Sequence, residues 1–142
     1  MSELRTGRAL PWYFWVVATL GILWNGFGAF LWWGSSFMAD TFLAGLTPDH
    51  RAYVIGLPGW SVFTWGLGVV GGLVGSILLL FRHRLAVTAL GLSLIGAVTN
   101  SLVYYTNPPP PGFFNLPLTA FIISFALFLL WFATAMKRRG LL

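Results

Sequence analysis

The sequence predicts an all-α membrane protein, namely a four-transmembrane-helix bundle with both termini in the cytoplasm. Of the 142 residues, 58% are hydrophobic and only 8% are charged, whereas soluble domains carry about 25% charged residues. The apolar residues form four runs, each long enough to cross the roughly 30 Å hydrocarbon core of a bilayer as a helix. For a chain of this length we expect one domain over residues 1–142.

The four predicted spans contain no Lys, Arg, Asp, Glu or His, and they run from about Pro11 to Trp33, Pro58 to Phe81, Leu85 to Tyr105 and Phe113 to Met136. The first run is too long and too aromatic for a cleaved signal peptide, so we expect it to remain as a span. Spans two and three are joined only by residues 82–84, and spans three and four by a turn with four consecutive prolines. Since proline cannot continue a helix, both connections predict antiparallel hairpins.

Basic residues gather at one side of the predicted bundle. They precede span one, link spans two and three, and follow span four: Arg5, Arg8, Arg82, Arg84, Lys137, Arg138 and Arg139. The opposite side carries Arg51, offset by Asp40 and Asp49. Because positive residues favour the cytoplasmic side of a membrane, this distribution places both termini in the cytoplasm. The net charge of +5 is therefore explained by the basic residues that set the membrane orientation. Since they do not gather on a folded polar face, we expect no nucleic-acid partner.

The loop between spans one and two is predicted to hold a short interfacial helix. Apolar residues from Phe37 to Leu46 recur at helical spacing on one face, as in helices that lie along a membrane surface. Thr47 followed by Pro48 is a typical helix start, with Thr47 as the N-cap. Span two then begins either at Pro58, or at Pro48 with a kink at Pro58.

Span two carries a stripe of small residues at four-residue spacing: Gly68, Gly71, Gly72, Gly75 and Ser76. Such spacing lets helix backbones approach closely in a membrane. We expect this stripe to pack inside the bundle, the alternative being contact with another chain. Span three has a similar stripe, from Ala89 to Ser101, and the two stripes are expected to face each other across the hairpin.

Asn25 is the polar residue at mid-depth in span one. An unpaired amide in hydrocarbon costs several kcal/mol, so we expect an interhelical hydrogen bond, with a substrate contact as the alternative. Thr99 and Asn100 are expected to satisfy loop backbone. Asp49 and His50 are adjacent and do not share a helix face, so a solvated helix start is favoured over a metal or acid–base pair.

The absences argue against several chemistries. The spans hold no charged group for ion coupling and no mid-depth histidine for a haem. We therefore predict no catalytic residues, no cofactor and no metal, and we expect the protein not to be an enzyme.

Three motifs resemble a family of small bacterial four-span membrane proteins, loosely labelled sugar transporters. They are Leu23-Trp24-Asn25-Gly26-Phe27-Gly28-Ala29-Phe30, Leu46-Thr47-Pro48-Asp49 and Gly56-Leu57-Pro58-Gly59-Trp60. The resemblance covers Pro11 to about Asn107 and implies the bacterial inner membrane. The family often has an acidic residue and a tyrosine shortly after the Trp-Asn motif, where this chain has Leu31 and Trp32, a departure that weakens ion coupling there.

Two functions follow as hypotheses. The first is a non-catalytic accessory subunit, or assembly factor, of a larger membrane complex, with other membrane subunits as partners besides the lipid bilayer. It rests on the glycine-faced span two and on the aromatic-rich surface. The second is a small transporter or permease, working as a homo-oligomer, for a neutral solute such as a sugar that Asn25 would contact.

Overall fold

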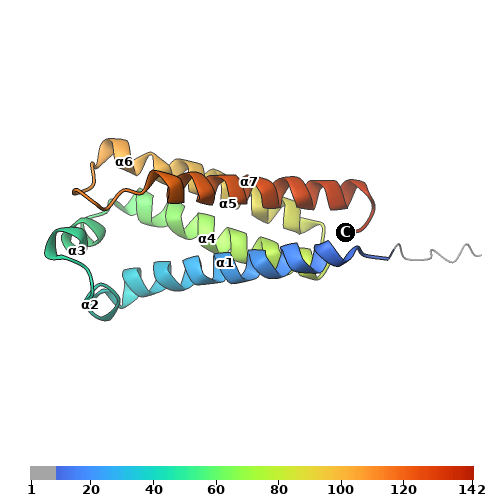
Figure 1. Cartoon of the computed structure of the whole chain (residues 1–142), viewed down its shortest axis with the longest axis horizontal. Coiled ribbons are helices and arrows are strands. Elements are labelled where there is room, and N and C mark those ends of the chain that lie inside the picture. The colour runs from blue at the N-terminus through green and yellow to red at the C-terminus, as the bar shows by residue number, and fades with distance from the viewer. Residues whose placement is uncertain (1–8) are drawn as a thin grey trace, which may run out of the picture.

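The computed structural model describes residues 9–142, and within them it is helical with no β-strand. Four helical segments are long and apolar enough to cross a membrane: α1 (Trp12–Phe37), α4 (Gly59–Leu80), α5 (Leu85–Ser101) continued by α6 (Val103–Thr106), and α7 (Leu116–Arg138). The first described residues and the C-terminus lie at the same end of the bundle (Figure 1). The predicted all-α four-span bundle is thus confirmed, and its architecture is that of a multi-pass membrane protein.

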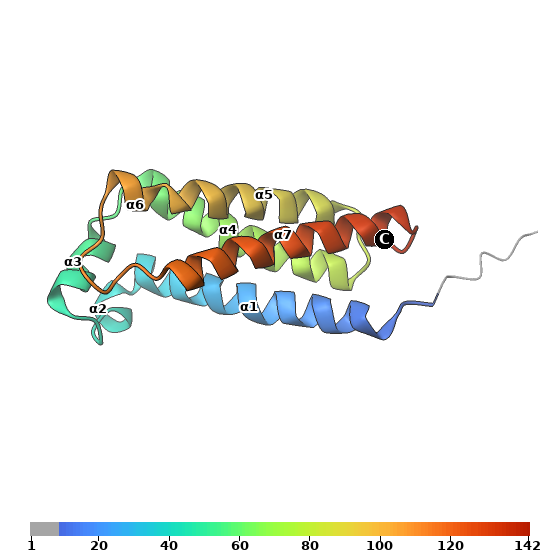
Figure 2. The same cartoon turned by 45° about the horizontal axis from the view of Figure 1, so that its top comes forward.

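The two ends of the bundle differ in structure. The end with the start of α1, the α4–α5 turn and the end of α7 is called here the terminal end. The other, called the loop end, carries α2 (Ala39–Phe42), α3 (Pro48–Ile55) and α6 (Figure 1). Figure 2 shows α7 lying across the bundle between α1 and α5.

The loop between α1 and α4 is more divided than predicted. α1 continues to Phe37, and only the single turn of α2 follows it. Thr47 caps α3 as predicted, because its Oγ1 accepts a hydrogen bond from the His50 N–H (3.4 Å). The alternative of one helix running from Pro48 into span two is wrong. α3 ends at Ile55, since Pro58 lacks an N–H and forces the residue before it out of helical geometry.

The last span begins three residues later than predicted, at Leu116 instead of Phe113. Asn115 sets this start, because its side-chain oxygen accepts a hydrogen bond from the Leu118 N–H (3.0 Å). Pro117 then falls in the first turn, where a missing N–H costs nothing.

α4 is the central helix, and its small residues face two neighbours. Gly68 and Gly71 lie against the α5 backbone around Ser93, and Gly75 lies against Leu90 of the same helix. The hydroxyl of Ser93 donates to the Gly68 carbonyl (2.6 Å). The structure therefore brings the small-residue stripes of spans two and three together across the hairpin.

The other two stripe residues of α4 face α1. The amide of Asn25 lies over Gly72, and the Ser76 side chain lies against Gly21. Further along the same contact, Trp32 packs on Gly66 and its indole N–H donates to the Val62 carbonyl (2.9 Å). The whole stripe thus lies inside the bundle, with α5 on one side and α1 on the other.

A hydrophobic core fills the terminal end. Its largest buried side chains come from α1, α4, α5 and α7 and include Phe14, Leu79, Leu90, Leu129 and Phe132. Leu141, the second-last residue, is buried against this core, and its carbonyl accepts a hydrogen bond from the Arg82 side chain (2.8 Å). Arg82 itself has a positive φ of 60°, in the left-handed turn that ends α4.

Two of the three buried serines in the described chain, Ser76 and Ser93, predict opposite effects on stability. Ser76 Oγ is buried without a hydrogen-bond partner in the described chain, whereas Ser93 Oγ is bonded to Gly68. Ser76→Ala should therefore raise the free energy of unfolding by about 1 kcal/mol, and Ser93→Ala should lower it by about the same amount. Unfolding of both variants in mixed detergent micelles measures this, and a similar loss in both would contradict it.

Candidate functional site

A cavity of about 360 Å³ opens in the half of the bundle nearer the loop end. It lies among α1, α4, α5 and α7, with α3 and the turn before α7 contributing at its top. Its lining is mainly apolar and includes Trp24, Gly28, Trp65, Val69, Ala97, Phe125 and Ala126. Ligand pockets in proteins commonly have volumes from about 300 to 1,000 Å³, so this cavity is large enough to hold a small molecule.

Asn100 is the polar residue that the structure places most clearly at this cavity. Its Oδ1 accepts hydrogen bonds from Ser61 Oγ (3.1 Å) and Thr64 Oγ1 (3.4 Å) of α4. Within residues 9–142 its Nδ2 donates no hydrogen bond, so this donor is available to a ligand. The expectation that Asn100 satisfies loop backbone is wrong, because its side-chain oxygen accepts hydrogen bonds from the Ser61 and Thr64 hydroxyls of α4 instead.

Asn25 also lines the cavity, but the interhelical hydrogen bond expected for it does not form. Its Nδ2 donates to the Gly21 carbonyl one turn earlier in α1 (2.9 Å). Gly21 lies one turn earlier on the same face of α1, which brings its carbonyl within reach of the Asn25 side chain. Asn25 is 8% exposed, and its amide rests on Gly72, where any larger residue would displace it.

The loop end of the cavity is closed by a structure called here the cap, formed by α3 and residues 107–113. The Tyr53 hydroxyl donates to the Asn107 carbonyl (2.7 Å), and His50 Nε2 lies 3.1 Å from the Pro111 carbonyl oxygen. The Phe113 ring contacts both side chains, with centroid separations of 5.4 Å to His50 and 4.8 Å to Tyr53. The His50 and Tyr53 side chains of α3 therefore contact the turn at residues 107–113 and are not simply solvated.

Two charged residues near the cap form a salt bridge. Arg51 pairs with Asp40 at 3.1 Å. Within the described chain no group of three or more His, Asp or Glu residues could hold a metal ion. Burial raises the pKa of the Tyr53 phenol above its ordinary value, so its hydroxyl keeps the donated proton well into the alkaline range.

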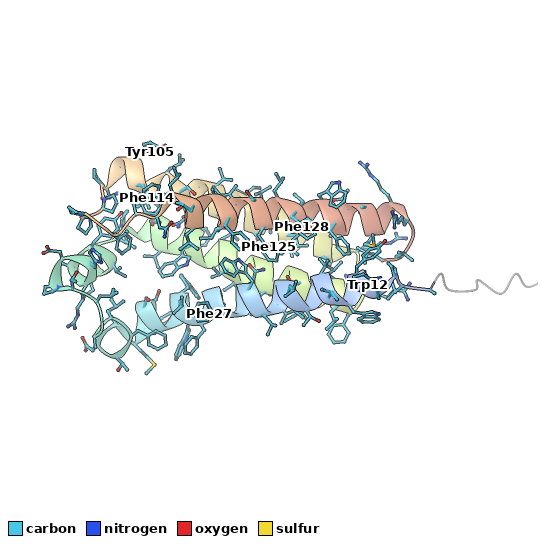
Figure 3. The ribbon with its side chains drawn as sticks, viewed as in Figure 1. Trp12, Phe27, Tyr105, Phe114, Phe125 and Phe128 are labelled. Atoms are coloured by element: carbon cyan, nitrogen blue, oxygen red, sulfur yellow. The ribbon has the colours of Figure 1, made fainter. Side chains whose placement is uncertain are left out.

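Loss of the Tyr53 hydroxyl should loosen the cap. Tyr53→Phe removes the bond to Asn107 and should lower the free energy of local opening by about 1 kcal/mol. Faster amide hydrogen exchange in α3 measures this change. Tyr105→Phe is the matched control, because Tyr105 is 85% exposed at the same end (Figure 3). Equal exchange rates in the two variants would show that the hydroxyl does not hold the cap closed.

The wall between α1 and α7 is made of aromatic side chains, called here the aromatic seam: Trp24, Phe121, Phe125 and Phe128. Trp24 meets Phe121 and Phe125 edge to face, with centroids 5.0 Å and 6.1 Å apart. Phe125 stacks with Phe121 at 5.8 Å and with Phe128 at 6.3 Å. In Figure 3, Phe125 and Phe128 lie on the side of α7 that faces α1.

The cavity suits binding better than catalysis. Among the described residues, those that line it include no Asp, Glu, Lys, Arg or His, and Tyr53 and Tyr104 are its ionisable groups. The polar groups that remain can orient a ligand by one or two hydrogen bonds. The sequence did not reveal this site, because its residues come from six separate helices and most of them alone look like ordinary apolar positions.

No family model, curated protein or solved structure matches this chain. The fold and the cavity together therefore define only a class, that of multi-pass helical membrane proteins with a ligand-sized internal cavity. Any more specific function has to rest on the geometry of the cavity itself.

Proposed function

We propose that this protein is a small membrane binding protein or permease for an uncharged, mainly apolar molecule. The observation that carries the proposal is the cavity of about 360 Å³, lined mainly by apolar side chains with the free donor of Asn100 at its loop end. A membrane bundle normally fills its interior, since packing provides much of its stability. A void of ligand size is therefore best explained by an occupant.

The lining also indicates which molecules fit. A charged ligand would lose its hydration without gaining an ionic partner, which is costly in a medium of low dielectric constant. A sugar would leave most of its hydroxyls unpaired against Trp24, Val69 and Phe125. The chemistry therefore favours an uncharged molecule with a large apolar part and one polar group over the sugar implied by the family label.

The accessory-subunit hypothesis loses its main support in this geometry. It rested on the glycine face of α4, yet that face is covered within the chain by α1 and α5. The surface that α4 leaves exposed carries large apolar residues such as Phe63, Val70 and Val74, which are suited to contact with lipid. We therefore favour the binding function over the accessory role.

We propose the bacterial inner membrane as the location, with the terminal end in the cytoplasm. Arg82, Arg84, Lys137 and Arg138 lie at that end, whereas Arg51 at the loop end is paired with Asp40. Arg5 and Arg8, which enter the same prediction, lie outside the described residues. With this orientation the cavity occupies the outer half of the membrane.

Thermal unfolding of the purified protein in detergent, with three probes, tests the proposal. Dodecan-1-ol should raise the unfolding temperature in a saturable manner, because a ligand that binds only the folded state stabilises it. Dodecylammonium, with the same chain and a charge, and glucose should have little effect. Stabilisation by glucose alone would contradict the proposed chemistry, and stabilisation by none of the probes would contradict the site.

A further inference from the structure

We infer that the ligand enters the cavity sideways from the bilayer, through the aromatic seam, and lies with its polar group toward the loop end. This inference rests on the proposed function and makes it more specific. The ligand is then a membrane-partitioned amphiphile with an alcohol or similar uncharged head, such as a long-chain alcohol, and not a solute taken up from water.

The contacts of α4 close two sides of the cavity. Gly68 lies against the backbone of Ala97 in α5, and the Ser93 hydroxyl bonds to the Gly68 carbonyl. On the other side the Asn25 amide covers Gly72, and Trp32 bonds to the backbone of α4. Opening either side would separate helix backbones and break these hydrogen bonds.

Both ends of the cavity are closed as well. The buried core of Phe14, Leu90, Leu129 and Phe132 blocks the path to the terminal end. At the loop end the cap is fastened by the Tyr53 bond to Asn107 and by the contacts of His50. A ligand arriving from water at that end would have to break polar contacts as well as ring contacts.

The aromatic seam differs from these barriers because α1 and α7 meet there through side chains. Both helices pack mainly on other partners, α1 on α4 and α7 on α5. Phe121 is 51% exposed on the outer surface, while Trp24 and Phe125 line the cavity. Other lining residues of α1 and α7 are also exposed, such as Phe27 (60%) and Leu118 (48%), so the cavity is already partly open on this side. Rotation of the seam rings would widen this opening to the lipid without breaking a backbone contact or a hydrogen bond.

The polarity of the lining sets the orientation of the ligand. Ser61, Asn100 and Thr119 lie near the loop end, and Val69, Phe125 and Ala126 are apolar parts of the lining. Asn25 and Ser93 also line the cavity, but their donors are already bonded to the carbonyls of Gly21 and Gly68. An amphiphile would place its hydroxyl beside Asn100 Nδ2 and its chain beside the seam. The same orientation holds for a lipid in the adjacent leaflet, so the molecule need not invert on entering.

Cross-linking tests this route, and the absence of native cysteines makes engineered pairs unique. One double variant, Trp24→Cys with Phe121→Cys, ties the seam, where the native rings lie 5.0 Å apart. The other, Tyr53→Cys with Phe113→Cys, ties the cap, where they lie 4.8 Å apart. Each variant is reconstituted in vesicles and linked with a short bis-maleimide, while a second sample is treated with a mono-maleimide as the unlinked control. Both samples are then given a diazirine-bearing dodecanol. Flash photolysis and peptide mass spectrometry follow the rate of cavity labelling.

Linking the seam should slow labelling by at least about tenfold, whereas linking the cap should change it by less than about twofold. Slowing by the cap link alone, or by neither link, would overturn the lateral route while leaving the binding function intact. An absence of cavity labelling in the unlinked variants and in the native protein would instead contradict the binding function itself.

Discussion

Gly96→Ala should be among the most destabilising single substitutions in the bundle. A Cβ atom at this position would lie 2.6 Å from the backbone nitrogen of Gly68 and 2.8 Å from the carbonyl oxygen of Thr64. Both atoms belong to the α4 backbone, which cannot yield without separating α4 from α5. We expect a loss of about 2–3 kcal/mol in the free energy of unfolding, at the upper end of the range for overpacked cores.

The control for this prediction is Gly91→Ala on the same helix. A Cβ at Gly91 would meet no atom within 4 Å, so the better helix propensity of alanine should leave the variant neutral or up to about 1 kcal/mol more stable. Unfolding in mixed micelles with increasing dodecyl sulfate compares the two. Similar stability of the two variants would show that α4 and α5 do not approach as closely at Gly96 as described.

Ala126→Phe should abolish ligand binding by filling the cavity. Ala126 lies on α7 and lines the cavity together with Phe125 of the same helix and Val69 of α4. The added ring should weaken the binding of dodecan-1-ol by at least about tenfold, which corresponds to about 1.4 kcal/mol. The measurement is the concentration dependence of the unfolding temperature, compared with that of the native protein.

Ala120→Phe provides the matched control, since it makes the same change on the same helix. Ala120 is exposed and does not line the cavity. This variant should bind dodecan-1-ol as the native protein does. Equal weakening in both variants would indicate a general effect of a bulky residue on α7, and unchanged binding in Ala126→Phe would place the ligand elsewhere.

Much of the fold could be predicted because its signals are local. Uncharged runs marked the four spans, the Thr47-Pro48 pair marked the start of α3, and the short 82–84 link required an antiparallel hairpin. The expected meeting of the two small-residue stripes also followed from spacing alone, since close helix contacts need small side chains at regular intervals. Two span boundaries shifted most: α7 begins later because Asn115 caps it, and α1 continues past Trp33 to Phe37.

The site could not be predicted because it depends on pairings between helices. Periodicity shows that Asn25 needs a hydrogen-bond partner, but it cannot show that Gly21 of the same helix is nearer than α4. Nor can it show that Asn100 accepts hydrogen bonds from the hydroxyls of Ser61 and Thr64. It also cannot show that α1 and α7 meet through aromatic side chains such as Trp24 and Phe121. These features arise from the crossing of whole helices.

Native mass spectrometry of the protein purified from its own membrane in a mild detergent tests the central claim most directly. The native protein and Ala120→Phe should each carry an additional bound mass corresponding to one small uncharged amphiphile. Ala126→Phe, with its cavity filled, should lack that mass. If all three proteins carry the same bound mass, or if none carries any, the cavity among α1, α4, α5 and α7 is not a binding site.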